Sequence, residues 1–235
     1  MPGSMREIDP RLNPLSNFKR LGGDQRIADE KRRGEPDKNY RFKDIFFPYA
    51  GGVRDLGLAT LKKEHKNVIT DGNSTYPGIR SEVDSGLQQY IRTELEKGLD
   101  LEIDRFDAYY HLVPGIHNCG LYHVDDAQLA GLVYLNPKNP CPEESGTYIG
   151  KRLLEGKVGK PFNDASATSN KRIIESFNVL KTEWNASHFE TINRIHNYYN
   201  RLVVYEGKVP HAPGTYFGKD FDDSRLTLTF FFNTK

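Results

Sequence analysis

The chain has 235 residues, of which 37% are hydrophobic and 28% charged, with 13 Tyr and 13 Phe. This supply of apolar and aromatic side chains excludes a disordered chain, so we expect a folded, soluble protein with one large domain. The 33 basic and 32 acidic side chains leave a formal net charge of +1, which disfavours a protein that binds nucleic acid through phosphate charge.

The cysteines and the apolar runs indicate the compartment. Cys119 and Cys141 are the two cysteines of the chain, which make no disulfide framework and fit a reducing environment. No apolar run approaches the ~18 residues that cross a bilayer, and the first residues are not followed by the apolar segment of a signal peptide. We therefore expect a cytoplasmic protein without a membrane partner.

The N-terminal segment differs in composition from the rest of the chain. Residues 1–43 are polar, rich in charge, Gly and Pro, and without a sustained period, which predicts an extended arm. Within it, residues 1–4 look like the remnant of an expression tag. Residues 44–235 are predicted to form a single domain, with an insertion at about residues 150–199.

Two helices are predicted ahead of a β-rich remainder. A short apolar strand is expected at residues 44–49, where Pro ends it, and a short amphipathic helix at residues 53–63. A second helix is expected at residues 81–98, with Ser81 and Asp84 as capping residues. This order is typical of an α+β protein.

The remainder is predicted to be mostly strands. Residues 150–170 are polar and rich in Gly, which indicates a loop, and residues 170–199 contain helical stretches. Within the helical stretches, one apolar face is expected from Ile173, Ile174, Phe177 and Leu180. The expected strands are residues 106–113, 129–135, 147–149, 201–205 and 225–232.

A His-x-Asp pair provides the strongest local signal. Side chains alternate along an extended chain, so His123 and Asp125 point to the same side and can occupy adjacent positions on one metal. A third ligand must come from elsewhere, and His211, which follows a β-rich segment, is the candidate. Two histidines and one carboxylate on one face of a metal are typical of non-haem iron(II) oxygenases. Taken alone, the pair would equally fit a surface turn or a strand end.

The expected strand at residues 225–232 carries a cation on one face. Alternation places Arg225, Thr227 and Thr229 on that face and the apolar residues on the other. Burying an arginine costs several kcal/mol unless an anion meets it. A dicarboxylate cosubstrate would supply that anion, with Arg225 as a bidentate fork. The alternative is a solvent-facing strand with an ordinary surface arginine.

The order of these motifs, His-x-Asp, a distant His and then Arg-x-Thr, resembles the iron(II)/2-oxoglutarate-dependent oxygenase superfamily. Within it, the resemblance is to a prolyl-hydroxylase-like branch of small bacterial and phage members. Residues 129–136, 145–148 and 200–207 look like further core strands of that family, and the resemblance covers roughly residues 44–235. It implies an α+β, mainly β fold: a double-stranded β-helix (jelly-roll or cupin-like) core with the N-terminal helices packed on one sheet.

The resemblance also implies a reaction and its cofactors. The protein would be a dioxygenase that uses iron(II), 2-oxoglutarate and O2 to hydroxylate an amino-acid, peptide or protein side chain, releasing succinate and CO2. The iron ligands would be His123, Asp125 and His211. The residues that bind 2-oxoglutarate would be Arg225 and Thr227. Of the three tyrosines Tyr110, Tyr122 and Tyr134, one could add its hydroxyl, and Tyr134 is the candidate; a packing aromatic is the alternative.

The same resemblance limits the substrate. Prolyl 4-hydroxylases usually carry Lys at the position of Arg225, so prolyl specificity does not transfer. DNA-dealkylating oxygenases place a second Arg where this chain has Thr229, which argues against a repair enzyme. Arg80, delivered by a Tyr-Pro-Gly turn, and Tyr122 are the candidate substrate-binding residues. A turn with an arginine at a helix start and a packing aromatic are the respective alternatives.

Other candidates are interpreted as structural. His111 and His117 lie at six-residue intervals before His123, but nothing aligns them on one strand face, so we expect satisfied structural histidines. Two functions besides the side-chain hydroxylase stay open: hydroxylation of a small-molecule metabolite, and a non-catalytic metal-binding barrel. A cupin-type metalloenzyme that does not use 2-oxoglutarate would have no need of a buried Arg225.

Overall fold

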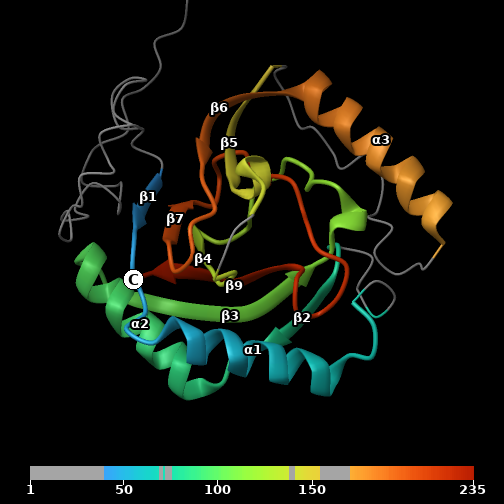
Figure 1. Cartoon of the computed structure of the whole chain (residues 1–235). Coiled ribbons are helices and arrows are strands. Elements are labelled where there is room, and N and C mark those ends of the chain that lie inside the picture. Colours follow the sequence, from blue (N-terminus) through green and yellow to red (C-terminus); the bar gives the residue numbers. More distant parts are fainter. Residues whose placement is uncertain (1–39, 69–70, 72–75, 138–140, 154–169) are drawn as a thin grey trace, which may run out of the picture.

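Two antiparallel β-sheets, with helices on the outside, make up the computed structural model shown in Figure 1. The structure describes residues 40–68, 71, 76–137, 141–153 and 170–235. The six-stranded sheet has the order β1-β7-β4-β9-β3-β2 and the three-stranded sheet the order β6-β5-β8. Within the described residues, no helix has the length and apolar character needed to cross a membrane.

The strands of the six-stranded sheet come from both halves of the chain. They are β1 (Tyr40–Lys43), β2 (Ile79–Glu82), β3 (Ile103–Val113), β4 (Leu129–Tyr134), β7 (Leu202–Glu206) and β9 (Arg225–Thr234). The three-stranded sheet consists of β5 (Thr147–Arg152), β6 (Phe189–Ile195) and β8 (His211–Pro213). The helices are α1 (Ala50–Glu64), α2 (Ser85–Leu99) and α3 (Lys171–His188), and Gly115–His117 and Glu143–Ser145 form short 3-10 turns.

One face of the six-stranded sheet is covered by α1 and α2, as expected (Figure 1). The apolar side of β9 faces these helices, because Leu226, Leu228 and Phe230 belong to the same core cluster as Leu61 and Ile91. These side chains are at most 1% exposed, and each contributes about 1.5–3 kcal/mol through burial. This layer holds β9 in a fixed register with β3 and β4.

The opposite face of the large sheet meets the small sheet. Ala130, Leu132 and Val203 of the large sheet share a second cluster with Ile149 and Ile195 of the small sheet. The alternation expected for β9 is confirmed, because Phe231 packs against this second cluster while Phe230 lies in the first. Arg225 and Thr227 therefore face the space between the two sheets.

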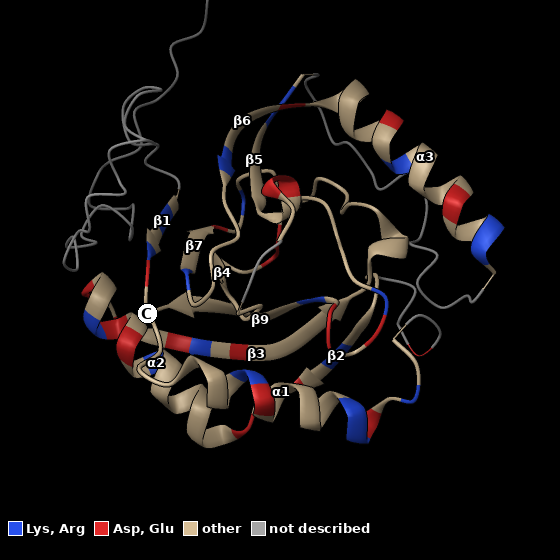
Figure 2. Ribbon diagram, viewed as in Figure 1, with Lys and Arg blue, Asp and Glu red and all other residues tan. Residues whose placement is uncertain are grey.

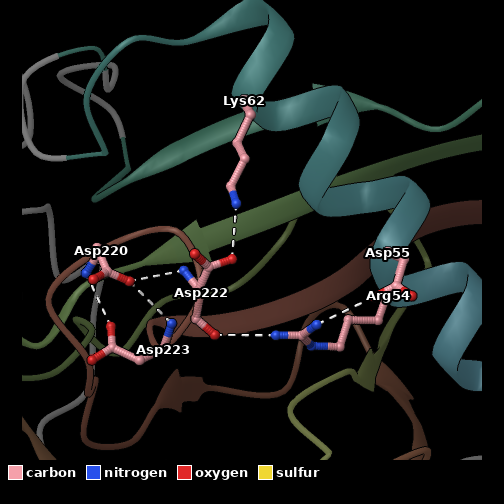
Figure 3. A network of polar contacts seen from close by, with 6 residues as sticks. All are labelled: Arg54, Asp55, Lys62, Asp220, Asp222 and Asp223. Atoms are coloured by element: carbon pink, nitrogen blue, oxygen red, sulfur yellow. Dashed lines mark hydrogen bonds and ion pairs between the residues drawn. The ribbon is translucent and has the colours of Figure 1, made fainter.

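The turn before β9 is attached to α1 by polar contacts (Figure 3). Lys62 Nζ lies 2.8 Å from the carboxylate of Asp222, and Arg54 donates a 3.1 Å hydrogen bond to the main-chain oxygen of Asp222. Asp220 and Asp223 close the turn through hydrogen bonds to main-chain N–H groups. These groups are exposed, so they contribute little to stability, but they orient the chain that enters Arg225.

Charges of both signs are mixed along the helices and β3 (Figure 2). On α2 the alternation has a local cause, since Arg92 pairs with Glu96 at 3.2 Å and Lys97 pairs with Glu94 at 3.2 Å. Pairs at these spacings lie one turn apart and stabilise a helix modestly.

The strand expected at residues 44–49 is wrong. Those residues form a bend and a turn, and the strand lies earlier, in β1, at the end of the predicted arm. Ile45 has a φ of 55°, which breaks an extended chain. The main-chain N–H of Phe47 is satisfied by the side chain of Asn200, 2.9 Å away, rather than by a neighbouring strand. Residues 1–39 of the arm lie outside the described residues.

The second helix is confirmed, but one of its two predicted caps is wrong. Asp84 accepts a hydrogen bond from the N–H of Leu87 and is the N-cap of α2. Ser81 lies in β2 instead, where its side chain is buried. Extended pairing with β3 keeps Ser81 in a strand, three residues before the N-cap Asp84.

The insertion contains a helix, α3, as expected, but the last part of the insertion is not helical. Residues 189–195 form β6, which pairs with β5. The predicted apolar face of α3 is also wrong in part, because Ile174 is buried whereas Ile173 and Leu180 are 43% and 47% exposed. Of the loop predicted at 150–170, residues 150–152 belong to β5, and residues 154–169 lie outside the described part of the chain.

Candidate metal centre

His123 and His211 are held side by side by main-chain hydrogen bonds. The N–H of His123 donates to the oxygen of His211 at 3.0 Å, and the N–H of His211 donates to the oxygen of His123 at 2.9 Å. His211 begins β8, while His123 lies on the short extended segment beside it. The N–H of Asp125 donates to the oxygen of Gly207 at 2.7 Å, so the main chain of Asp125 is held in place as well.

These contacts bring the three side chains predicted as metal ligands together. Nε2 of His211 lies 3.2 Å from Oδ2 of Asp125, and Nε2 of His123 lies 3.6 Å from Oδ1. One donor atom from each of the three residues lies within 4.8 Å of the others. The period-two geometry predicted for His123 and Asp125 is thus present, and the distant histidine completes the cluster.

Both imidazoles are oriented by their own main chain. Nδ1 of His123 lies 2.9 Å from the oxygen of Leu121, and Nδ1 of His211 lies 2.9 Å from the oxygen of Val209. A carbonyl oxygen only accepts, so Nδ1 carries the proton in each ring. The neutral form then has its lone pair on Nε2, which is the tautomer that binds a metal.

The surroundings of Asp125 favour the ionised form of its carboxyl group. Burial by itself would raise the pKa of Asp125, but His211, His123 and the positive charge of Arg80 outweigh burial and lower that pKa. Oδ2 is buried and accepts no hydrogen bond from the described residues. Two neutral imidazoles and one carboxylate with an unsatisfied oxygen fit a divalent cation such as iron(II).

Gly207 and Lys208 support the cluster and were missed at the sequence level. A side chain on Gly207 would collide with the main-chain oxygen of Ala127 and approach Asp125, so only glycine allows the turn after β7 to pass this close. Lys208 donates a 2.9 Å hydrogen bond to the main-chain oxygen of Asp125. The signal for both depends on their distance from Asp125 in space, which no local pattern shows.

Arg225 is 2% exposed. Among the described residues, no carboxylate lies within 4.0 Å of its guanidinium. Its Nε donates to the main-chain oxygen of Ser145 at 3.1 Å, while Nη2 is buried without a hydrogen-bond partner in that part of the chain. The guanidinium lies 5.6 Å from the ring of Tyr134 and 5.7 Å from that of Tyr216. The surface-arginine alternative is therefore excluded.

Tyr134 and Thr227 lie on the same sheet face as Arg225. Tyr134 is paired with Thr227 across β4 and β9, so their side chains point to the same side. The hydroxyl of Tyr134 lies 2.7 Å from that of Thr147, and the hydroxyl of Thr227 lies 3.2 Å from that of Thr229. Burial raises the pKa of Tyr134, with nearby Arg225 acting in the opposite direction.

A cavity of about 730 Å³ opens beside Asp125. Arg80 of β2 lines it, with its guanidinium 4.1 Å from the centre of the Tyr76 ring and its Nε without a hydrogen-bond partner among the described residues. Burial lowers the pKa of Arg80, and Tyr76 and Asp125 act in the opposite direction. The cavity has the size of a small-molecule site, and Arg80 is placed at it as a candidate substrate-binding residue.

Tyr122 is not among the residues that line this cavity, so its expected role in substrate binding stays a prediction. The side chain is 4% exposed, its hydroxyl lies 2.7 Å from that of Thr191, and its ring stacks on Phe189 at 4.8 Å. Tyr122 precedes His123, and period-two alternation turns its ring away from the side on which His123 and Asp125 face the cluster. The contacts of the ring fit the packing alternative for this residue.

The two histidines interpreted as structural are both buried. Nε2 of His111 lies 2.8 Å from the main-chain oxygen of Pro77, so a structural histidine with a partner is confirmed there. His117 is fully buried, but both ring nitrogens lack a hydrogen-bond partner within the described chain. The expectation of a satisfied ring is therefore wrong for His117, where burial, reinforced by Lys181, lowers the pKa to about 4.

Comparison with known proteins yields structural neighbours. No protein-family model and no curated protein matches the sequence. A prolyl hydroxylase from Trichoplax adhaerens, solved in complex with a hypoxia inducible factor oxygen degradation domain peptide fragment, is 11% identical with a TM-score of 0.50, covering 83% of each chain. A Pseudomonas putida prolyl-4-hydroxylase is 20% identical with a TM-score of 0.48, covering 84% of this chain and 93% of that chain. The likeness to the Trichoplax structure shows that this chain has the fold of a prolyl hydroxylase.

Proposed function

We propose that this protein is an iron(II)- and 2-oxoglutarate-dependent dioxygenase of the prolyl-hydroxylase-like branch. It would hydroxylate an amino-acid, peptide or protein side chain and release succinate and CO2. The observation that carries this proposal is Arg225, a buried cation without a carboxylate partner in the described chain, on the sheet face that also approaches the His-Asp-His cluster.

The comparison between two buried arginines supports this choice. Arg201 is buried too, but it meets the carboxylate of Asp44 through two hydrogen bonds of 2.6 and 3.0 Å. Among the described residues, the side chain of Arg225 donates to one main-chain oxygen, that of Ser145, and its Nη2 has no hydrogen-bond partner. A buried charge without a counter-ion is costly, so a bound carboxylate would explain why Arg225 is retained there.

Aromatic side chains connect Arg225 with the metal cluster. The ring of Tyr205 lies 4.3 Å from that of His211, and Tyr205 shares a buried cluster with Tyr134. Tyr134 in turn lies 5.6 Å from the guanidinium of Arg225. A short dicarboxylate lying along these rings could meet Arg225 at one end and the metal at the other, which is the requirement for 2-oxoglutarate.

The residues then have distinct roles. Iron(II) would be held by His123, Asp125 and His211, and 2-oxoglutarate by Arg225, Thr227 and Tyr134. When bound, the iron with 2-oxoglutarate and O2 supplies the oxidising chemistry. The protein keeps both imidazoles in the ligating tautomer, keeps Asp125 ionised, and excludes water from the carboxylate bound by Arg225.

The substrate would enter through the cavity beside Asp125. Arg80 can donate to a carbonyl or carboxylate there, because its Nε has no partner among the described residues. The Trichoplax neighbour was solved with a peptide, and the exposed residues Asp126 and Lys208 lie beside Asp125, since Lys208 donates to the main-chain oxygens of both Asp125 and Asp126. We therefore propose a peptide or protein substrate rather than a free metabolite.

The two sheets would be the two halves of a double-stranded β-helix. The metal cluster joins β8 of the small sheet to the turn after β7 of the large sheet, where such a barrel would open. Residues 44–235 would form this oxygenase domain, with β1 added from the end of the arm, and a cytoplasmic location remains part of the proposal.

Succinate formation tests the proposal. We expect the purified protein to convert 2-oxoglutarate to succinate and CO2 only when iron(II) and O2 are present, as measured by mass spectrometry. His211→Ala should abolish the conversion. A non-catalytic barrel would bind iron without producing succinate, and a cupin-type enzyme would turn over without 2-oxoglutarate. Conversion that persists in His211→Ala would refute the assignment of the site.

A further inference from the structure

Helix α3 contacts the rest of the protein through a stripe of polar side chains as well as through apolar ones. Asn178, Lys181 and Asn185 are spaced by three and four residues, which places them on one face of the helix. Lys181 is 1% exposed, and with Ile174 it is one of the two buried residues of the helix. Ile174 and Trp184 supply apolar packing on the same side of the helix, so the polar stripe adds directed contacts that packing does not require.

The first two residues of the stripe hold the main chain of the turn after β3. Asn178 Nδ2 donates to the oxygen of Ile116 at 2.7 Å, and Lys181 Nζ donates to the oxygen of His117 at 2.7 Å. Both acceptors are main-chain oxygens that no helix or strand ladder satisfies. The helix therefore fixes the path of the chain independently of the side chains on that turn.

Asn185 holds the same segment at two points, directly before the proposed metal ligand. Its Nδ2 donates to the oxygen of Gly120 at 2.9 Å, and its Oδ1 accepts from the N–H of Tyr122 at 3.0 Å. This paired contact sets both the distance and the rotation of the chain at Tyr122. His123 follows at once, and its own N–H is committed to His211.

The side chain of Tyr122 is fixed by the strand that follows α3. Its ring stacks on Phe189 with an interplanar angle of 18°, and its hydroxyl lies 2.7 Å from that of Thr191. A side chain on Gly150 would collide with the same ring, so β5 closes the remaining side. Main chain and side chain of Tyr122 are thus held by different elements.

We propose that Asn185 is a positioning residue for the metal site, acting through Tyr122 on His123. The inference rests on the proposed function, because it takes His123 as an iron ligand. Groups that orient a metal ligand from behind change metal affinity about 10–100-fold when they are removed. Here the orienting contact comes from the insertion helix, so α3 supports the metal centre rather than covering it.

Asn185→Leu tests this inference, because leucine has a similar volume and removes both hydrogen bonds. Asn178→Leu is the matched control: it lies on the same helix and removes one bond to the same segment, seven residues before His123. Two measurements are made. Amide hydrogen exchange of residues 119–125 is followed in the metal-free protein, and the Kd for Co(II) is measured by calorimetry without 2-oxoglutarate.

We expect Asn185→Leu to speed exchange in residues 119–125 and to raise the Kd for Co(II) about tenfold or more, while Asn178→Leu changes that Kd less than about threefold. Should Asn185→Leu not fold, Thr191→Val, which removes the hydroxyl partner of Tyr122, is expected to raise the Kd in the same direction. An unchanged Kd in Asn185→Leu, or an equal rise in Asn178→Leu, would overturn the inference. A wild-type protein that binds no Co(II) would instead overturn the proposed function, and the exchange measurement would still report whether Asn185 holds the segment.

Discussion

Nε2 of His211 lies 3.2 Å from Oδ2 of Asp125. Main-chain groups hold both of these residues in place. Val209 holds Nδ1 of His211 through its oxygen, and Gly207 holds the N–H of Asp125. The donor atoms are therefore close together before any cation arrives. A site that is organised in advance loses little conformational entropy on binding.

Asp125→Asn should abolish metal binding, because an amide is a poor substitute for the anionic ligand that balances the charge of iron(II). The neighbouring carboxylate provides a matched control, since Asp126 is exposed and belongs to no cluster of potential ligands in the described part of the chain. We expect the Kd for Co(II) to rise at least about 100-fold in Asp125→Asn and to stay unchanged in Asp126→Asn. Calorimetric titration measures both, and an equal loss in the two variants would show that general charge, not ligation, attracts the metal.

Arg225→Met should separate cosubstrate binding from stability. Two charge-assisted hydrogen bonds contribute about 3 kcal/mol, so the Kd for 2-oxoglutarate should rise about 100-fold. The free energy of unfolding without ligand should stay within about 1 kcal/mol of wild type or increase, because an uncompensated buried charge is removed. Urea denaturation with and without 2-oxoglutarate measures both quantities.

Arg201→Met is the contrasting variant. Arg201 has a carboxylate partner, Asp44, whose side chain is 38% exposed. Its removal should lower the free energy of unfolding by about 1–3 kcal/mol, less than for a fully buried pair because water still reaches Asp44. The stabilisation by 2-oxoglutarate should persist. If Arg225→Met were the less stable of the two in the absence of ligand, Arg225 would be a structural residue.

The sequence was sufficient to predict the His123–Asp125 pair because the information for it is local, whereas His211 was predicted from the order of the motifs along the chain. His123 and Asp125 share a side by alternation alone, and Arg225 is marked by an apolar strand. The supports of the cluster could not be predicted in the same way. Asn185 lies 62 residues from His123 in the sequence, and its role depends on where α3 docks. The packing of Tyr122 could not be predicted either, because its partners Phe189 and Thr191 lie on β6, in a segment where the sequence predicts helical stretches.

The fold shows the same division between local and distant contacts. Periodicity located α1, α2, β3, β4 and β9 within a few residues. It failed at residues 44–49, where apolar side chains suggested a strand but Asn200, far along the chain, binds Phe47 and holds a bend. Long-range hydrogen bonds of this kind override local propensity.

His117 should make the protein less stable as the pH falls. Burial lowers the pKa of His117 to about 4 from a usual value of 6.5. Below pH 6.5 the unfolded chain therefore binds a proton that the folded protein does not, and stability falls until about pH 4. The full effect is about 3 kcal/mol. His117→Leu keeps the main-chain oxygen that accepts from Lys181. The variant should lose the part of the pH dependence of stability that comes from the imidazole of His117.

Urea denaturation at pH 7 and pH 4.5 measures the effect. His111, whose pKa burial also lowers, is present in both proteins, so the difference between wild type and His117→Leu isolates His117. The wild type should lose about 2–3 kcal/mol more than the variant over this range. Parallel losses in the two proteins would mean that the ring of His117 accepts a proton in the folded state.

Asp84 and Ser81 were both predicted to cap α2, and substitutions should show that they contribute differently to stability. Asp84 accepts from the N–H of Leu87 at 3.0 Å, so Asp84→Ala should lower the free energy of unfolding by about 1 kcal/mol, and Asp84→Asn should restore most of it. Ser81 is 3% exposed, and its hydroxyl has no hydrogen-bond partner in the described part of the chain. Ser81→Ala removes that buried unsatisfied group and should leave stability unchanged or increase it. Thermal unfolding of the three variants decides the matter: a loss in Ser81→Ala as large as that in Asp84→Ala would mean that the serine contributes to the cap after all.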